Sequence, residues 1–203
     1  MKRFHAVTAA LLVLAFTAAG CAHMADDGWV TLIDGPKGLE NWNRVGDANW
    51  RGERDYIVAD QGKGGHLVSK KSYKDFILRA EFWAGDTTNS GIFIRASDPK
   101  KIGAANAYEI NIYDQRPGPE YATGAIVGFA MVPPGRYKAA GKWNTYEITA
   151  IGSELTVKFN GVVTVHTANG KFKEGPITLQ YGAGPKGAPG GTIRWRKVEI
   201  KEL

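Results

Sequence analysis

Short apolar runs separated by glycine and proline make up the chain from residue 29 to its C-terminus. Apolar and polar residues alternate within many of these runs, and none has the spacing of about 3.6 residues that an amphipathic helix needs. The pattern therefore predicts an all-β chain folded as an antiparallel sandwich or barrel. The expected strands are residues 29–34, 55–60, 65–70, 75–84, 91–97, 107–114, 124–132, 143–151, 154–160, 162–167, 176–182 and 192–203.

Three local patterns make this prediction more specific. Every second position of residues 76–82 is apolar, which predicts an antiparallel strand with one face in the core. Asn160 and Gly161 stand between two such strands and predict a two-residue hairpin turn, because both residues tolerate positive φ. The apolar phase of the last strand changes between Trp195 and Val198, which predicts a β-bulge there.

The strand expected at residues 107–114 has polar groups on one face. Side chains on a strand alternate between its two faces, so the tyrosine and two isoleucines at positions 108, 110 and 112 share one face. Glu109, Asn111 and Tyr113 share the other. The sequence therefore predicts either a solvated face or a site at these three residues.

Neighbouring strands offer further polar groups if the sheet order brings them close. Arg95 ends one expected strand, Gln180 lies in another, and His66 lies near the start of a third. Amides and carboxylates hydrogen-bond sugar hydroxyls, and aromatic rings pack against sugar faces; the chain has six Trp and eight Tyr. Structural readings stay open for two of them: Arg95 could pair with Glu81 or Glu109 within the sheet, and His66 could fill a half-buried structural position.

The first residues have the pattern of a bacterial export signal. Lys2 and Arg3 precede an apolar run at residues 6–19, which is shorter than the roughly twenty residues of a membrane-spanning helix. We expect a lipoprotein signal peptide at 1–20 with lipidation of Cys21, a tether at 21–28 and one domain at 29–203. This predicts an exported periplasmic or cell-envelope lipoprotein, anchored in the outer membrane; cleavage beside the cysteine without lipidation is the alternative.

Composition excludes several kinds of site. Cys21 is the only cysteine, so no disulfide can form within the chain, and after the signal only three histidines remain, which excludes a His-rich zinc site. No Asp-rich loop has the spacing of a calcium site, and no Gly-x-Ser-x-Gly elbow is present. The formal net charge is +6, and some of the basic residues belong to the signal while others lie within the expected strands. We therefore expect no nucleic acid partner.

The spacing of Glu109, Asn111 and Asp114 is similar to the Glu-x-Asp-x-x-Glu strand of sandwich-fold glucanases. In a retaining enzyme two carboxylates lie about 5 Å apart across the scissile bond. Asn111 cannot ionise, and Asp114 has a shorter side chain than Glu, so the pair would converge poorly. An ordinary glucanase mechanism is not expected, and Asp114 fits equally well as a cap of the following turn.

Seven segments in order resemble the bacterial 3-keto-disaccharide hydrolase family. They are GWVTLIDGPKGLENW, KDFILRAEFWAGDTTNSGIFIRA, AYEINIYD, TGAI, KWNTYEITAIGSELTVKFNG, GPITLQYG and IRWRKVEIKEL. The resemblance implies a concanavalin A-like jelly roll of two antiparallel sheets and an exported enzyme that cleaves 3-keto-glycosides or 3-keto-disaccharides. One departure is that Tyr181 and Gly182 stand where relatives commonly have a His.

On this reading we assign Glu109 as general base or acid and Arg95 and Asn111 as donors to the developing enolate. Tyr113, Gln180, Asp114 and His66 would contact the sugar. No cofactor is implied, although a divalent metal could supply the electrophile instead. Rival readings are a lectin-like carbohydrate-binding module, a conventional glycoside hydrolase and a structural envelope protein.

Overall fold

The structure is a computed structural model that describes Met1, residues 27–184 and residues 188–203. Apart from Met1, the predicted signal peptide lies outside the described residues, as do Cys21 and most of the predicted tether. In the part of the chain that is described, no helix has the length and apolar character needed to span a membrane.

The described residues form thirteen β-strands and two 3-10 helices of three residues each. The all-β prediction is confirmed. The elements are β1 (Trp29–Asp34), η1 (Leu39–Asn41), β2 (Trp42–Gly46), β3 (Arg51–Glu53), β4 (Tyr56–Ala59), β5 (Gly65–Tyr73), β6 (Phe76–Ala84), β7 (Ser90–Ile94), β8 (Tyr108–Ile112), η2 (Pro119–Tyr121), β9 (Trp143–Ile151), β10 (Glu154–Phe159), β11 (Val162–Ala168), β12 (Gly175–Tyr181) and β13 (Ile193–Glu202).

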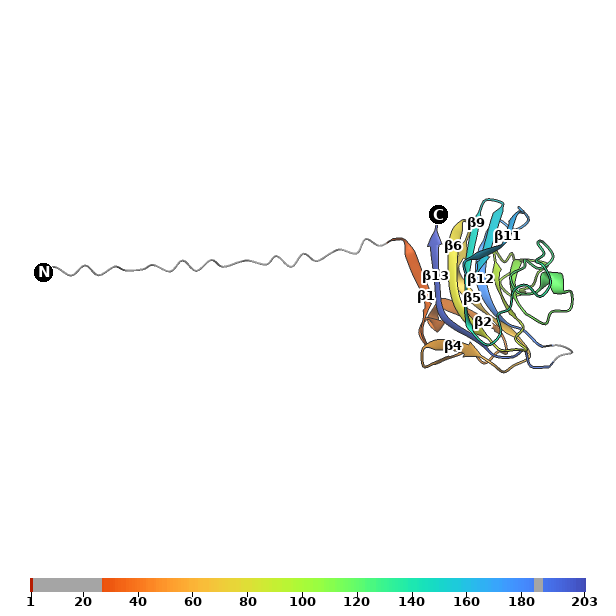
Figure 1. The fold of residues 1–203 in the computed structure, drawn as a ribbon, viewed down its shortest axis with the longest axis horizontal. Coiled ribbons are helices and arrows are strands. Elements are labelled where there is room, and N and C mark those ends of the chain that lie inside the picture. Colours follow the sequence, from red (N-terminus) through yellow and green to blue (C-terminus); the bar gives the residue numbers. More distant parts are fainter. Residues whose placement is uncertain (2–26, 185–187) are drawn as a thin grey trace.

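The strands form two antiparallel sheets that pack as a sandwich. The larger sheet has eight strands in the order β11-β10-β9-β6-β13-β4-β3, with β1 also paired to β13. The smaller sheet has five strands in the order β2-β5-β12-β7-β8. Figure 1 shows β13 between β1 and β6, so the two ends of the domain meet in the larger sheet.

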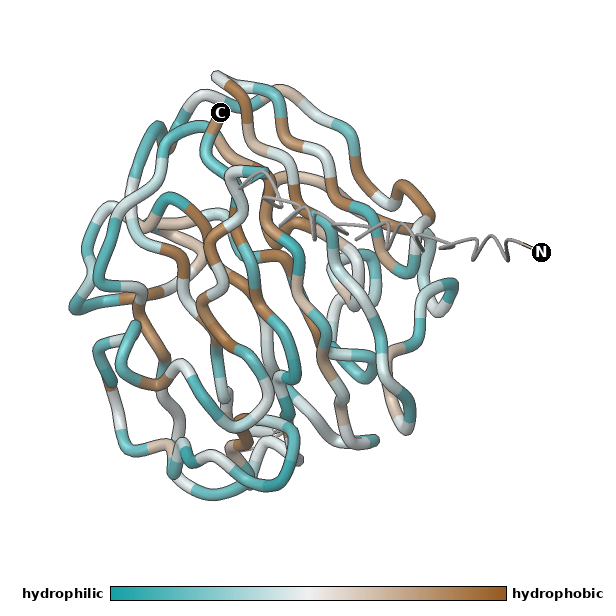
Figure 2. Tube along the Cα trace, turned by 90° about the vertical axis from the view of Figure 1, so that its left-hand side faces the viewer, coloured by the Kyte–Doolittle hydropathy of each residue, from teal (hydrophilic) through white to brown (hydrophobic). Residues whose placement is uncertain are grey.

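Alternating side chains build the core between the sheets. Along β6, the four side chains from Phe76 to Phe82 that point inward are all nearly inaccessible to water, whereas Arg79 between them is exposed. Figure 2 shows the same alternation of apolar and polar positions along other strands. Since a buried large apolar side chain contributes roughly 1.5–3 kcal/mol, this inner layer supplies most of the driving force for folding.

The predicted hairpin and bulge are both present. Phe159 pairs directly with Val162, and the turn residues Asn160 and Gly161 have φ of 49° and 81°. In β13 the register against β6 shifts between Trp195 and Lys197, where the change of apolar phase predicted a bulge. Both features follow from local sequence, because turn chemistry and strand phase are local properties.

The strand predicted at residues 124–132 is wrong. Ile126 makes single bridges to Ile110 and Ala130, and the rest of this segment turns. Gly124 and Gly128 have φ of 95° and 75°, so the chain leaves the extended conformation at both glycines. The segment still lies along β8, and it covers that edge of the smaller sheet.

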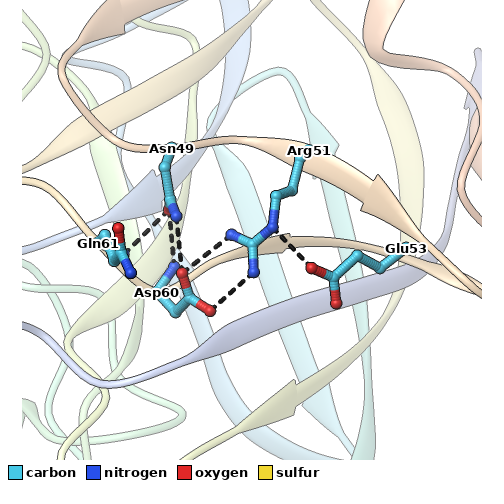
Figure 3. Close-up of polar contacts among 5 residues, drawn as sticks. All are labelled: Asn49, Arg51, Glu53, Asp60 and Gln61. Carbon is cyan, nitrogen blue, oxygen red and sulfur yellow. Dashed lines mark hydrogen bonds and ion pairs between the residues drawn. The ribbon is translucent and has the colours of Figure 1, made fainter.

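An ion-pair network fastens β3 and β4 at the edge of the larger sheet (Figure 3). Two guanidinium nitrogens of Arg51 donate to the two carboxylate oxygens of Asp60, each at 2.9 Å, and its Nε donates to Glu53. The bond from Arg51 is the main cause that lowers the pKa of Asp60 from 3.8 to about 2. Asn49 also donates to Asp60 and accepts from the backbone N–H of Gln61, so the network closes the end of this hairpin.

Candidate functional site

Polar side chains gather on the face of the smaller sheet that points away from the core. We call it the outer face of the smaller sheet. On β8 the aromatic and aliphatic side chains face inward, so Glu109 and Asn111 lie on this outer face, as their phase predicted. On β12 the core residues Leu179 and Tyr181 place Gln180 on the same face.

Cross-strand pairing sets these side chains in a row. Gln180 pairs with His66 of β5, and Gly91 of β7 pairs with Asn111. The pairs between β12 and β7 place Gln180 opposite Gly91. His66, Gln180, Gly91 and Asn111 therefore form one row across four strands, so the sheet order brings together residues that are far apart in sequence.

Glu109 lies in the next row and is kept from water. It pairs with Phe93, and only 7% of its surface is exposed. Burial raises the pKa of Glu109 from 4.5 to about 7, and the positive charge of Arg116 opposes part of this rise. At neutral pH the carboxyl group can therefore both accept and donate a proton, which is the property that general acid–base catalysis needs.

Two acceptor atoms near Glu109 are buried without a hydrogen-bond partner, namely Asn111 Oδ1 and Gln180 Oε1. The amide nitrogen of Asn111 donates to the carbonyl oxygen of Tyr121 at 2.7 Å, which fixes the orientation of the amide. Asn111 thus offers an acceptor. This corrects its assigned role as a donor to an enolate, because the donor side of the amide is engaged elsewhere.

Glu109 and Gln180 both lie close to Gly91. A Cβ atom on Gly91 would lie 3.5 Å from Glu109 Cγ and 3.7 Å from Gln180 Oε1. Both side chains therefore lie within van der Waals contact of the position that a side chain on residue 91 would occupy.

His66 is a half-buried, neutral member of the row. Burial lowers the pKa of His66 from 6.5 to about 4. Its Nδ1 lies 3.3 Å from Thr178 Oγ1, and its ring contacts Phe93 edge-on with 5.3 Å between centroids. At neutral pH it can offer a hydrogen bond to a ligand but no positive charge.

Arg95 does not join this group, which corrects its assignment as an enolate donor. Its side chain has no exposed surface. Its φ of 54° takes the backbone out of the extended conformation, so the alternation of side chains along the strand, on which that assignment rested, no longer applies at Arg95. The guanidinium donates to the carbonyl oxygens of Lys74, Gly152 and Phe172 and to the carboxylate of Asp75. Arg95 therefore joins three loops, and it pairs with neither Glu81 nor Glu109.

Asp114 is engaged in structural bonds, as the turn-capping alternative suggested. Its carboxylate accepts from the backbone N–H groups of Ala139 and Ala140 and from the hydroxyl of Thr123. It has little capacity left for a sugar, so the structure does not support its assignment to the substrate. Tyr113 is buried, lies just after β8 and belongs to neither of the two apolar clusters of the described residues.

Among the described residues, no cluster of three or more His, Cys, Asp or Glu side chains could hold a metal ion. A groove of about 460 Å³ lies on the outer face of the larger sheet. Its charged groups are paired with one another, for instance Glu147 with Arg79 at 3.0 Å and with Lys158 at 2.8 Å. Such cross-strand pairs stabilise a sheet and leave little unsatisfied capacity for a ligand.

Residues 28–201 match the model of the 3-keto-α-glucoside-1,2-lyase-like domain. The chain belongs to this family. No curated protein matches the chain. The match covers nearly the whole described domain, and it includes every residue of the row and Glu109.

Solved structures share the fold. Two proteins from Parabacteroides distasonis, each provisionally assigned as a glycosyl hydrolase, superpose with TM-scores of 0.70 and 0.71 at 24% and 18% identity. The first alignment covers 86% of this chain and 99% of that chain, and the second covers 87% and 94%. The carbohydrate-binding module CBM66 from Bacillus subtilis has a TM-score of 0.56 at 14% identity, covering 86% and 96%. These similarities confirm the jelly-roll sandwich that the sequence predicted.

Sequence reasoning missed three residues of the site. Arg116 lies in the loop after β8, where strand phase does not apply. Thr178 is a residue type that is common in strands, and Gly91 has no side chain that could suggest a role. Only the phase of β12 could have indicated Thr178, since it shares a face with Gln180. The positions of Arg116 and Gly91 relative to Glu109 depend on tertiary packing, which the sequence pattern does not reveal.

Proposed function

We propose that this protein cleaves glycosides that carry a ketone at C3, by elimination followed by hydration. The observation that carries the proposal is Glu109, a buried carboxyl group with a pKa of about 7 beside unpaired acceptors on a sheet face. Membership of a family described as 3-keto-α-glucoside-1,2-lyase-like supports the choice of substrate.

The reaction needs one proton acceptor. A C3 ketone acidifies the hydrogen on C2, so ionised Glu109 removes this proton and the electrons of the C–H bond form an enolate. The ketone then re-forms as the C1–O bond breaks and a C1=C2 double bond appears. Protonated Glu109 can return the proton to the leaving oxygen, and addition of water across the double bond gives the free 3-keto sugar.

The positive charge of Arg116 is the best candidate to stabilise the enolate. Its charge already acts on Glu109, and a cation near the oxygen where charge develops lowers the barrier of such a step. This route requires no second catalytic carboxylate. The site offers no second catalytic carboxylate, because Asn111 cannot ionise and the carboxylate of Asp114 is bound to backbone groups.

Release of nitrophenol from 4-nitrophenyl 3-keto-α-glucoside tests the proposal, with the unoxidised glucoside measured in parallel. We expect release from the keto substrate only, and Glu109→Gln should slow it by about 10²–10⁴, the usual contribution of a general base. Glu174→Gln removes an exposed carboxylate and is the matched control, with unchanged rates. Equal rates of nitrophenol release from the two glucosides would refute the proposal.

A carbohydrate-binding module without catalysis is the second candidate function. It is favoured by the similarity of the fold to the carbohydrate-binding module CBM66. Under this reading the same face holds a sugar through Gln180 and Asn111, and calorimetry detects binding while no nitrophenol is released.

A further inference from the structure

Asn111 Oδ1 and Gln180 Oε1 share a property that the reaction itself does not explain. Both are buried hydrogen-bond acceptors without a partner, on the same sheet face and in the same cross-strand row. Leaving such an atom unsatisfied destabilises a folded protein, so native structures hold few of them. Two in one row point to a ligand that brings two donors.

One strand, β7, lies between the two strands that carry these acceptors. Gly91 lies between them, and it lacks the positive φ that would by itself favour glycine. Neighbouring strands lie about 4.8 Å apart, so the backbones that carry Asn111 and Gln180 are separated by about twice that distance. A sugar ring bound across β7, with the side chains beside Gly91 moved aside, would present a hydroxyl to each of these two strands.

We propose that this site selects the position of the ketone by hydrogen-bonding the two hydroxyls that flank it. The C2 hydroxyl donates to Asn111 Oδ1, and the C4 hydroxyl donates to Gln180 Oε1. This assignment rests on the proposed function, because Glu109 on β8 must reach the C2 hydrogen, which places C2 toward β8 and C4 toward β12.

The arrangement rejects sugars oxidised at the wrong carbon. A ketone oxygen only accepts hydrogen bonds, so a carbonyl at C2 or C4 would face the unpaired oxygen of Asn111 or Gln180 with no proton between them. Such a contact leaves two buried acceptors unsatisfied and adds their repulsion. A carbonyl at C3 avoids both acceptors and keeps a hydroxyl on each side.

The test pairs a change in the protein with a change in the sugar. We expect wild-type kcat/KM for 4-nitrophenyl 3-keto-α-glucoside to exceed that for its 4-deoxy analogue by about tenfold or more. In Gln180→Leu, which has no acceptor, the two substrates should react within about twofold of one another. Gln61→Leu changes an exposed glutamine outside the row and should keep the wild-type preference.

Thermal melting separates this role from a structural one. Gln180→Leu removes an unpaired buried acceptor, so its melting temperature should not fall, whereas a glutamine that holds the fold together would lower it. Gly91→Ala is a second variant whose added methyl group enters the proposed sugar position. It should raise KM or abolish binding, and its Cβ, 3.0 Å from the carbonyl oxygen of Ile110, requires only a small backbone shift.

The failures of the two proposals are distinguishable. If wild type cleaves no 3-keto-glucoside, the proposed function fails, and the hydroxyl pairing is then tested by calorimetry with methyl 3-keto-α-glucoside and its 4-deoxy analogue. If wild type shows no preference for the 4-hydroxyl, or Gln180→Leu keeps the full preference, the pairing is overturned whatever the activity.

Discussion

The carboxyl group of Glu109 is held where its ionisation works against folding. Burial raises its pKa to about 7, so the folded protein resists the charge that the unfolded chain accepts near pH 4.5. A pKa raised in the folded state stabilises the fold most at low pH, and this stability is lost as the pH rises from about 4.5 through 7. A buried group that opposes stability in this way is typical of a functional site.

Glu109→Gln should therefore change how stability depends on pH. Between pH 5 and pH 8 we expect the wild-type free energy of unfolding to fall by about 2 kcal/mol more than that of the variant, because folding raises the pKa of Glu109 from 4.5 to about 7. Urea denaturation at the two pH values measures this difference. Parallel curves for wild type and variant would mean that the carboxyl group is solvated, and Glu174→Gln should follow wild type.

Residue positions were predictable only where strand phase governs them. Glu109, Asn111 and Gln180 share a face because side chains alternate along β8 and β12, and this much follows from the sequence. Arg95 was misplaced because its positive φ ends the alternation, and the role of Gly91 depends on packing across three strands.

The β10–β11 hairpin is an element whose stability rests on its turn. Gly161 has a φ of 81°, a conformation that alanine adopts only with strain, although no atom would contact an added Cβ within 4 Å. We expect Gly161→Ala to lower the free energy of unfolding by about 1 kcal/mol. Gly103→Ala is the control, because that site is equally open but has no positive φ, and it should change stability little. Equal losses in the two variants would refute the backbone explanation.

Elements with strong alternation or turn signals were predicted, and short or irregular ones were not. The change of apolar phase in β13 predicted the bulge, and Asn160 with Gly161 predicted the hairpin. In contrast, β3 has only three residues, and β2 (Trp42–Gly46) lacks alternation; both are edge strands whose pairing comes from their neighbours. The segment at 124–132 looked like a strand because apolar content does not reveal where glycines turn the chain.

At the scale of the whole molecule the two outer faces of the sandwich differ in kind. On the larger sheet, charged side chains pair across strands, as in Arg196 with Glu81 at 2.7 Å. On the smaller sheet, two amide oxygens are buried without hydrogen-bond partners, and the carboxyl group of Glu109 is buried on the same face. On the larger sheet, Nε of Arg194 also lacks a hydrogen-bond partner, but its guanidinium lies over the rings of Tyr56 and Trp83. Among the described residues, the buried acceptors without a partner lie on the smaller sheet, and this contrast cannot be seen in a sequence whose polar residues are spread along every strand.

Proton exchange at C2 of methyl 3-keto-α-glucoside in deuterated water tests the central claim most directly, since methoxide leaves slowly and the exchange can be followed by NMR. We predict that wild type speeds loss of the C2 proton signal well above the buffer rate, that Glu109→Gln returns it to the buffer rate, and that Glu174→Gln matches wild type. Exchange that is equally fast in Glu109→Gln, or no faster than buffer in wild type, would contradict the assignment of Glu109 as the base.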